Sequence, residues 1–418
     1  MHSLKGGSLA YAIFLALMVA IICSSMILLM YMNRSYFYKM DQFSRVKDDV
    51  YSGLAYLKSL DQSHLSRVHA APMDNAKSIW MRKSVWGAYE VIAAQSSRGN
   101  ISLKKAALIG YNNEWLGDVA LWLTDNNQKL KLSGNARIKG NCFLPKRGVG
   151  AAFVEGQHFT GNKLIQGLTK YSTANTPKLR TNYPDYWNNH LKFKRVYGDS
   201  VVEMESLVKE FERSFVSSTL LAFSDKEIVL DNRSLSGNII IQSSRAIIVD
   251  SSSWLNQVTL VAPVIRVRSN VKGGMHLVAT ESIIIDEGAV LNPPSSIIIL
   301  NDPSDKAITG ICELKTHSSF SGTIINLAGQ RHASNKSNLR IEKDALVKGI
   351  VYCLGNLELR GTVKGTVIAN KLFLKTPTGV YENHLLNGKI LRTGLVKQFP
   401  TIKIEDTTNK ALVATWLK

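Results

Sequence analysis

Four charged residues recur at one position of a repeated pattern, and they are the first candidates for chemistry. Asp231, Asp250, Arg268 and Asp286 stand 19, 18 and 18 residues apart, each directly after a short run rich in Ile and Val. If these runs stack as neighbouring strands, adjacent carboxylates lie roughly 5 Å apart, as they do in retaining glycosidases. An Asp after a strand also caps the backbone of its own turn, and we expect this structural role for the column.

No other residue pattern supports catalysis or metal binding. The nine histidines form no HxH or HExxH motif, GxSxG is absent, and no Gly-rich phosphate loop follows a strand. The cysteines (Cys23, Cys142, Cys312 and Cys353) include no CxxC pair, so they predict neither a zinc site nor a disulfide framework, although one bridge would fit. We therefore expect a protein that is not an enzyme and that has no metal and no cofactor.

A basic and aromatic segment is the best candidate for ligand binding. Five basic residues between positions 178 and 195 are interleaved with Tyr183, Tyr186, Trp187, Phe193 and Tyr197. Basic groups hold phosphates or uronates, and flat rings stack on bases or sugars. The candidate residues for binding an anionic ligand are Lys178, Arg180, Trp187, Lys192, Lys194 and Arg195. The alternative is a loop whose rings pack inward and whose charges are solvated.

The net charge agrees with an anionic partner. Beyond residue 40 the chain carries 48 basic and 32 acidic residues, a net charge of +16. This excess favours nucleic acid, acidic polysaccharide or lipid headgroups as partners. A basic surface that serves only solubility is the alternative.

The N-terminal region contains a long uncharged stretch. No charged residue falls between Lys5 and Arg34, so 28 consecutive residues are uncharged. As a helix they would extend about 42 Å, more than the roughly 30 Å of bilayer hydrocarbon. The apolar run continues through Met26–Met32 to aromatic residues 36–38, whereas a secretory signal peptide is shorter. The stretch predicts a single-pass membrane anchor.

The residues just before this stretch carry a family resemblance. Lys5, Gly6 and Gly7 form a short basic leader, which resembles that of type IV pilins and pseudopilins, where a peptidase cuts after such a glycine. The resemblance implies a mature chain that begins at Ser8, or at Gly7. Mature position five, usually Glu in pilins, is Ala12 here, or Tyr11 if the mature chain begins at Gly7. The absence of this acid is similar to the K-type minor pseudopilins. An uncleaved anchor is the alternative.

The flanking charges and the resemblance disagree about orientation. The leader offers only Lys5 and the α-amine, whereas four basic residues follow the span: Arg34, Lys39, Arg45 and Lys47. Counting Lys and Arg alone would place the large domain inside the cell. Prepilin-like proteins insert with the leader inside, and we expect an exported domain on an inner-membrane anchor.

Helical order continues beyond the span. Val46, Val50, Leu54, Leu57 and Leu60 recur at steps of three or four residues, and no proline precedes Pro72. One helix over residues 8–60 is therefore expected, half in the membrane and half a stalk, which resembles the first helix of a pilin.

The next segment predicts a small antiparallel sheet. Residues 77–83, 85–95, 101–110 and 119–125 indicate four strands divided by turn residues. A small sheet after a long helix resembles a pilin head. We expect its aromatic residues to pack between sheet and helix: Trp80, Trp86, Tyr89, Trp115 and Trp122.

From residue 130 onward the sequence repeats itself. Residues 130–141 (LKLSGNARIKGN) align with residues 339–350 (LRIEKDALVKGI), and residues 357–366 (LELRGTVKGT) are a shortened copy. In the middle region, runs of β-branched residues begin at positions 228, 247, 265 and 283. Coils of 16 to 19 residues that stack with a constant period predict a parallel, right-handed β-helix. This pattern resembles the bactofilin and other polymer-forming coil domains.

Two further segments lie outside the repeats. Met204, Leu207, Phe211 and Phe215 have helical spacing, which predicts a helix against the β-helix. The tail after Gly394 is expected either to cap the end of the β-helix or to stay loose.

These observations predict a mainly β chain with seven parts. They are a leader (1–7), a transmembrane and stalk helix (8–62), a small α+β head (63–129), first β-helix coils (130–180), an aromatic, basic and helical insertion (181–226), the main β-helix (227–392) and a C-terminal cap or tail (393–418). The expected function is assembly or tip adhesion of a pilus-like or secretion filament, beside other pilin-like subunits. The alternatives are a membrane-tethered bactofilin-like scaffold and a polysaccharide-active β-helix enzyme.

Overall fold

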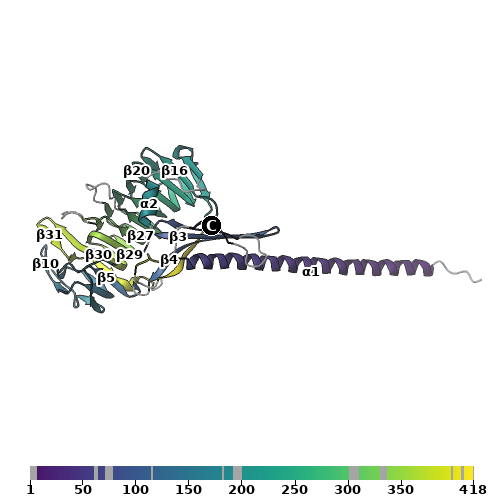
Figure 1. The fold of residues 1–418 in the computed structure, drawn as a ribbon, viewed down its shortest axis with the longest axis horizontal. Helices are drawn as coiled ribbons and strands as arrows, with labels where there is room; N and C mark the ends of the chain where they lie inside the picture. Colours follow the sequence, from purple (N-terminus) through teal and green to yellow (C-terminus); the bar gives the residue numbers. More distant parts are fainter. Residues whose placement is uncertain are drawn as a thin grey trace, which may run out of the picture.

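The structure is a computed structural model that describes most of the chain. The described residues are 7–60, 65–70, 79–113, 116–180, 183–191, 200–300, 310–329, 337–396, 399–405 and 409–417. They form a mainly β protein from which one long helix projects (Figure 1).

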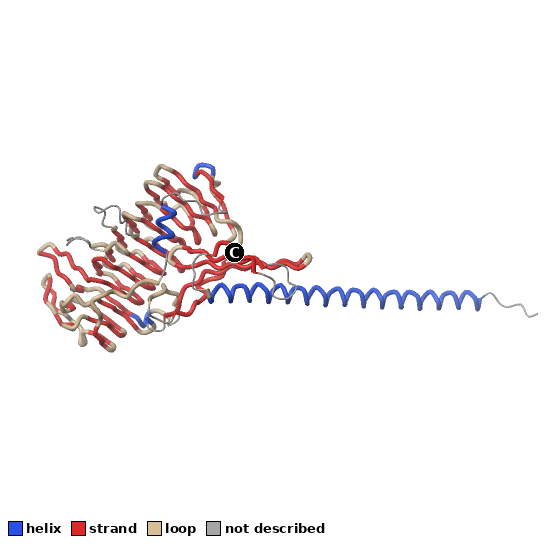
Figure 2. Tube along the Cα trace, in the orientation of Figure 1, coloured by secondary structure: helices blue, strands red, loops and turns tan. Residues whose placement is uncertain are grey.

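Helix α1 (Gly7–Ser59) is 53 residues long and continuous, which confirms the predicted single helix. Its first half touches nothing else in the described chain, and it is long and apolar enough to cross a membrane. Its last turns are different, because Val46, Val50, Leu54 and Leu57 are buried. The helix therefore has a free apolar half and a half fixed to the body (Figure 2).

An antiparallel sheet follows the helix, and we call it the head sheet. Its strands are β1 (Leu65–Ala70), β2 (Ile79–Trp86), β3 (Tyr89–Arg98), β4 (Ile101–Asn113) and β34 (Asn409–Leu417), paired in the order β1-β2-β3-β4-β34. The first three predicted strands are confirmed as β2, β3 and β4. The fourth is also a strand, β5 (Val119–Leu123), but its expected place in the antiparallel sheet is wrong, because it pairs in parallel with strands of a different sheet. All five residues of β5 are buried, as is usual for a strand covered on both faces.

The expectation for the C-terminal tail is also wrong. Instead of capping the coils or staying loose, β34 pairs with β4 as an edge strand of the head sheet, with Ala411 opposite Tyr111. Ile402 and Ile404, just before it, are buried against the head sheet. The tail therefore returns to the sheet that follows the N-terminal helix.

A large sheet of 24 strands forms the rest of the body. Its strands are β5, β7 (Arg137–Lys139), β8 (Asn141–Leu144), β12 (Ile165–Gln166), β13 (Thr169–Tyr171), β14 (Ser200–Glu203), β15 (Glu210–Arg213), β16 (Leu220–Ser224), β17 (Ile228–Leu230), β18 (Ser234–Gly237), β19 (Ile239–Ser243), β20 (Ala246–Val249), β21 (Trp254–Val261), β22 (Val264–Val267), β23 (Lys272–Ala279), β24 (Ser282–Ile285), β25 (Val290–Ile299), β26 (Ile311–Leu314), β27 (Ser319–Asn326), β28 (Leu339–Ile341), β29 (Leu346–Leu359), β30 (Thr362–Thr376), β31 (Gly379–Glu382) and β33 (Lys389–Leu391). Smaller sheets pair β10 (Phe153–Val154) with β11 (Gln157–His158), and β6 (Leu130–Ser133) with β9 (Val149–Ala151) and β32 (His384–Leu386).

The strands of the large sheet are stacked in columns, and we call them the coil stack. One column joins Ile228, Ile247, Ile265, Ile283, Cys312, Leu339, Leu357 and Leu372 by parallel pairing. All but Ile228 are fully buried, and each buried branched side chain contributes about 1.5–3 kcal/mol by leaving water. The repeats read from the sequence therefore correspond to stacked, parallel strands.

The N-terminal coils continue the stack beyond its C-terminal coils. Val347 pairs with Val363, Val363 with Ile390, and Ile390 with Ile138, so the aligned repeats share one column. The chain leaves this end near residue 171, passes through α2 (Tyr183–Leu191), and re-enters at the opposite end with β14. It then returns coil by coil to meet β5.

The helix predicted from the spacing of Met204, Leu207, Phe211 and Phe215 is wrong. This segment forms β14, a short turn of 3-10 helix (Met204–Ser206) and β15, which make the first coil of the return path, and then β16, which pairs with β14 and begins the next coil. Met204, Leu207 and Leu220 are buried in the core of the stack. The three-residue step between Met204 and Leu207 reflects a tight turn, not a helical face.

The turn between β2 and β3 fixes the head sheet to the coil stack. Trp86 Nε1 donates a hydrogen bond of 2.8 Å to the Gln257 carbonyl, and the Ala88 amide donates one of 3.0 Å to Ser296 Oγ. Gly87, at φ +58°, leaves no room for a side chain, because a Cβ there would lie 2.2 Å from Ser296 Oγ.

His276 lies at the centre of this contact and has only uncharged hydrogen-bond partners. Its Nδ1 lies 2.9 Å from Ser296 Oγ, and its Nε2 lies 3.2 Å from Gln257 Oε1. Burial lowers the pKa of His276 from 6.5 to about 3. The imidazole is therefore neutral in the folded protein at neutral pH.

We expect this histidine to make the folded protein less stable in mild acid. Below pH 6.5 this histidine is protonated in the unfolded chain, but in the folded chain it stays neutral down to about pH 3. The free energy of unfolding therefore falls by up to about 1.4 kcal/mol for each unit by which the pH is lowered in this range. Urea unfolding followed by tryptophan fluorescence at pH 7, 6 and 5 measures this slope. His276→Gln should show a smaller slope than the wild type, and equal slopes would contradict the assignment.

Candidate functional site

The first candidate site is the free half of α1. Its large apolar side chains from Leu9 to Met32 are mostly more than half exposed, with nothing in the described chain to cover them. Such a surface is stable only in lipid or against other apolar helices. Gly7 and Ser8 form the first turn of the helix, whereas Gly6 lies outside the described residues.

The acidic column forms as predicted, and two of its carboxylates, those of Asp250 and Asp286, are paired with basic side chains. Asp250 Oδ2 lies 2.7 Å from Arg268 Nη1, while its Oδ1 accepts hydrogen bonds from the amide and hydroxyl of Ser252. The hydrogen bond from Arg268, together with those from Ser252, lowers the pKa of Asp250. Asp231 is exposed at the next turn.

Asp286 is held in the same way two coils farther along the column. Its carboxylate lies 2.7 Å from Arg266 Nε and 3.0 Å from Lys315 Nζ. Burial raises the pKa of Asp286, but the hydrogen bonds from Arg266 and Lys315 outweigh it and hold the pKa below its usual value. A general acid needs a raised pKa, so this geometry supports turn capping and cross-strand pairing.

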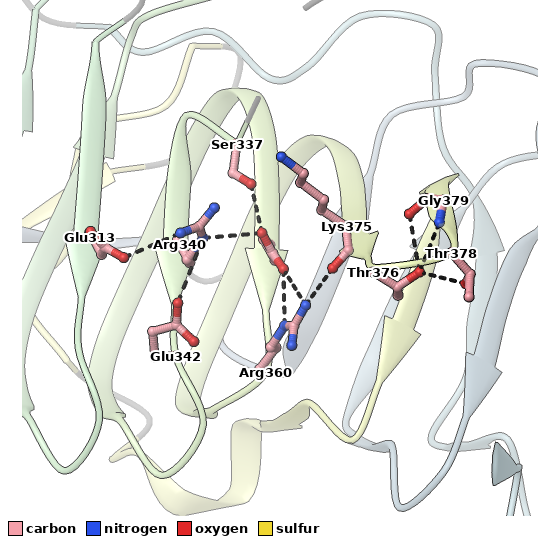
Figure 3. Close-up of polar contacts among 10 residues, drawn as sticks. Glu313, Ser337, Arg340, Glu342, Arg360, Lys375, Thr376, Thr378 and Gly379 are labelled. Atoms are coloured by element: carbon pink, nitrogen blue, oxygen red, sulfur yellow. Dashed lines mark hydrogen bonds and ion pairs between the residues drawn. The ribbon is translucent and has the colours of Figure 1, made fainter. Parts of the chain in front are cut away.

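A second charged cluster, not predicted from the sequence, lies farther along the stack, and we call it the charge ladder. Glu313, Arg340 and Glu358 stand opposite one another on three neighbouring strands. Arg340 Nη1 lies 3.3 Å from Glu313 Oε1, and Arg340 Nε lies 3.2 Å from Glu358 Oε2. Figure 3 shows Arg340 between Glu313 and Glu342, with Arg360 directed at the Lys375 backbone.

Glu358 is the residue that connects the other members of the charge ladder. Its side chain is only 3% exposed, and its two oxygens accept hydrogen bonds from Ser337 Oγ at 2.7 Å, Arg340 Nε at 3.2 Å and Arg360 Nε at 2.9 Å. A buried carboxylate with several charge-assisted partners stabilises a fold only while the partners are present. The signal in the sequence was the 18-residue spacing of oppositely charged Arg340 and Glu358.

The basic and aromatic segment is split by the structure. Trp187 is fully buried in α2, and its Nε1 donates a hydrogen bond of 3.1 Å to the Gly87 carbonyl. The expectation that Trp187 stacks on a ligand is therefore corrected, because its ring is part of the core. Lys178 and Arg180 are exposed beside the strand-like residue Leu179, and Lys192, Lys194 and Arg195 lie outside the described residues.

The cysteines show no bond or metal site in the described part of the chain. All four are free, and only Cys23 is exposed. Burial raises the pKa of the Cys142 and Cys353 thiols to about 12, so both stay protonated. No group of three or more His, Cys, Asp or Glu side chains among the described residues could hold a metal ion.

Comparison with known proteins does not assign the chain to a family. No protein-family model matches the chain, and no curated protein matches it. Among solved structures, the competence-associated pilin ComZ from Thermus thermophilus aligns over 85% of this chain and 87% of that chain, with 8% identity and a TM-score of 0.23. A similarity this low does not establish a shared fold or a shared function.

We expect the charge ladder to depend on Glu358. Glu358→Gln removes the charge from a buried carboxylate that three groups share, which should lower the free energy of unfolding by about 1–3 kcal/mol. Glu342→Gln is the matched control, because its carboxylate is 3.7 Å from Arg340 and 27% exposed, and its effect should stay within about 0.5 kcal/mol. Urea unfolding of both variants decides, and equal losses would contradict the role of Glu358.

Proposed function

We propose that this protein is a membrane-anchored, minor-pilin-like protein of the cell envelope. In this proposal the free half of α1 lies in the inner membrane and packs beside other pilin-like subunits of a pilus-like or secretion filament. The coil stack would be a right-handed parallel β-helix that is exported and displayed on the filament. Its work would be assembly of the filament or adhesion at its tip.

The division of α1 into two halves is the observation that carries this proposal. The first half is uncharged and exposed on every side, while the second half buries Val46, Val50, Leu54 and Leu57 against a small antiparallel sheet. A plain membrane anchor needs no rigid continuation into a folded domain. A helix that assembles laterally does, because it must hold its domain at a fixed angle to its neighbours.

The order of the chain supports export and processing. The described helix begins at Gly7, so cleavage before Gly7 or Ser8 would leave the helix intact. Gly6, Gly7 and Ser8 are the processing residues of the proposal. The +16 charge beyond residue 40 suits an anionic polymer as a further partner.

A second candidate function is favoured by the two ends of the coil stack. At one end, β14 and β15 pair on one side only in the described chain, and four exposed acids lie there: Glu203, Glu205, Glu210 and Glu212. At the other end, β12 and β13 are also edge strands, and exposed Lys163 and Lys170 lie in a segment without acids. Open edges of opposite charge would let copies stack end to end as a membrane-tethered, bactofilin-like scaffold.

Lateral packing of α1 should be detectable through Cys23. Because the other three cysteines are buried, a membrane-permeable bismaleimide should join Cys23 of one chain to a cysteine near it in the assembled membrane. We expect an adduct larger than the monomer on non-reducing gels of membranes. Cys23→Ser is the matched control and should abolish it.

Two further variants keep this test decisive. Ala16→Cys and Ala20→Cys, each in the Cys23→Ser background, sample other positions of the same apolar half, so one unfavourable register does not decide the result. Monomer alone at every position would contradict lateral assembly. N-terminal sequencing of the same protein should return Ser8 or Gly7, and Met1 would remove the pilin-like proposal.

A further inference from the structure

One corner of the coil stack is built from turns of unequal length. The turns before β25, β27 and β29 each contain four residues, as in Glu342–Ala345 between β28 and β29. The corresponding turn between β29 and β30 contains only Arg360 and Gly361. This is the physical origin of the 16-residue spacing between Val347 and Val363. Gly361 is required there, because a Cβ would lie 2.5 Å from the carbonyls of Glu342 and Ala345.

The two-residue turns 360–361 and 387–388 lie side by side between the longer turns 342–345 and 134–136. They leave a hollow, which we call the corner notch. It has a volume of about 370 Å³, within the range of small-ligand sites. Six polar side chains from five separate parts of the chain line it: Asn135, Gln157, Lys343, Arg360, Asn387 and Lys389. Asp344 and Thr362 complete the polar lining.

The floor of the corner notch is rigid. Arg360 donates hydrogen bonds to Glu358 and to the Lys375 carbonyl, which fixes its guanidinium. Asn387 Oδ1 accepts a hydrogen bond of 2.8 Å from the Asn135 amide, and Asn387 Nδ2 donates one of 2.9 Å to Gln157 Oε1. A site whose polar groups are already fixed loses little entropy when it binds a ligand.

Two lysines remain available at the rim of the corner notch. Lys343 and Lys389 are exposed, and within the described part of the chain neither forms an ion pair with a carboxylate. Two ammonium groups over a rigid hollow attract an anion. The charge of Arg360 is already paired with Glu358, so the two lysines supply the attraction.

The remaining lining selects among anions. Asp344, Thr362 and the amide side chains offer donors and acceptors for hydroxyl groups, which a bare phosphate does not need. The lining contains no aromatic side chain, so it offers no ring on which a nucleic-acid base could stack. From this combination we infer that the corner notch binds an acidic sugar unit, such as a uronate, of an anionic polysaccharide. This inference rests on the proposed function only in placing the coil stack outside the cell.

The test uses the full chain in non-ionic detergent micelles and trigalacturonate as the probe. Isothermal titration at low salt should show saturable binding that weakens with added salt, and maltotriose, which is neutral, should show none. Lys343→Gln/Lys389→Gln should weaken trigalacturonate binding at least about tenfold and flatten the salt dependence. Lys209→Gln/Lys272→Gln, which changes two exposed lysines elsewhere on the stack, is the matched control and should bind like the wild type.

Three results would overturn the inference. They are no binding of trigalacturonate by the wild type, equal binding by the wild type and the Lys343/Lys389 variant, and tighter binding of single-stranded DNA that depends on the same lysines. The last result would identify a phosphate polymer as the ligand. Because binding is measured on the purified chain, its failure is independent of the Cys23 cross-links that test the proposed function.

Discussion

The head sheet is buried on both of its faces, and the placement of the other parts follows from this burial. On one face, Met81, Ile92 and Ile109 cover the last turns of α1. On the other, Val85, Trp86 and Tyr89 cover an apolar side of the coil stack. Lys83 connects the head sheet to the end of α1. Its Nζ donates a hydrogen bond to the Leu60 carbonyl just after α1 and lies 3.0 Å from the buried carboxylate of Glu90. Such a pair is costly to break once buried, so the helix and the head sheet are held in one arrangement.

Closure of the chain on itself explains why the body depends on contacts between distant residues. The Thr124 amide donates a hydrogen bond to the Ala369 carbonyl, so the end of β5 lies beside a strand that follows it by about 245 residues in the sequence. The tail then passes back to the head sheet, where β34 pairs with β4. Neither the first coils nor the head sheet is complete before the last residues are in place. Contacts of this separation form slowly and only as a set.

The sequence predicted those features that repeat or that extend over many residues. The 53-residue helix follows from an uncharged run and regular apolar steps, and the stacked strands follow from the 16- to 19-residue period. The sequence did not predict features that depend on contacts between distant segments. The apolar run of β5 fits a buried strand of any sheet. The position of β34 depends on its pairing with β4 at Tyr111. The spacing of Met204 and Leu207 is the same as on a helix because a tight turn also brings residues three apart to one side. The acidic column was placed correctly, whereas the charge ladder and corner notch required the register of strands and turns.

We propose that the coil stack is exported on a membrane-anchored helix, and the side of the membrane on which it lies can be measured by thiol labelling. Lys272→Cys in the Cys23→Ser background places one exposed thiol on the coil stack, because the remaining cysteines are buried. Spheroplasts that express this variant are treated with a membrane-impermeant maleimide before and after permeabilisation. If the coil stack is exported, intact spheroplasts should be labelled fully. Labelling only after permeabilisation would place the coil stack in the cytoplasm, which would rule out export and favour a tethered scaffold.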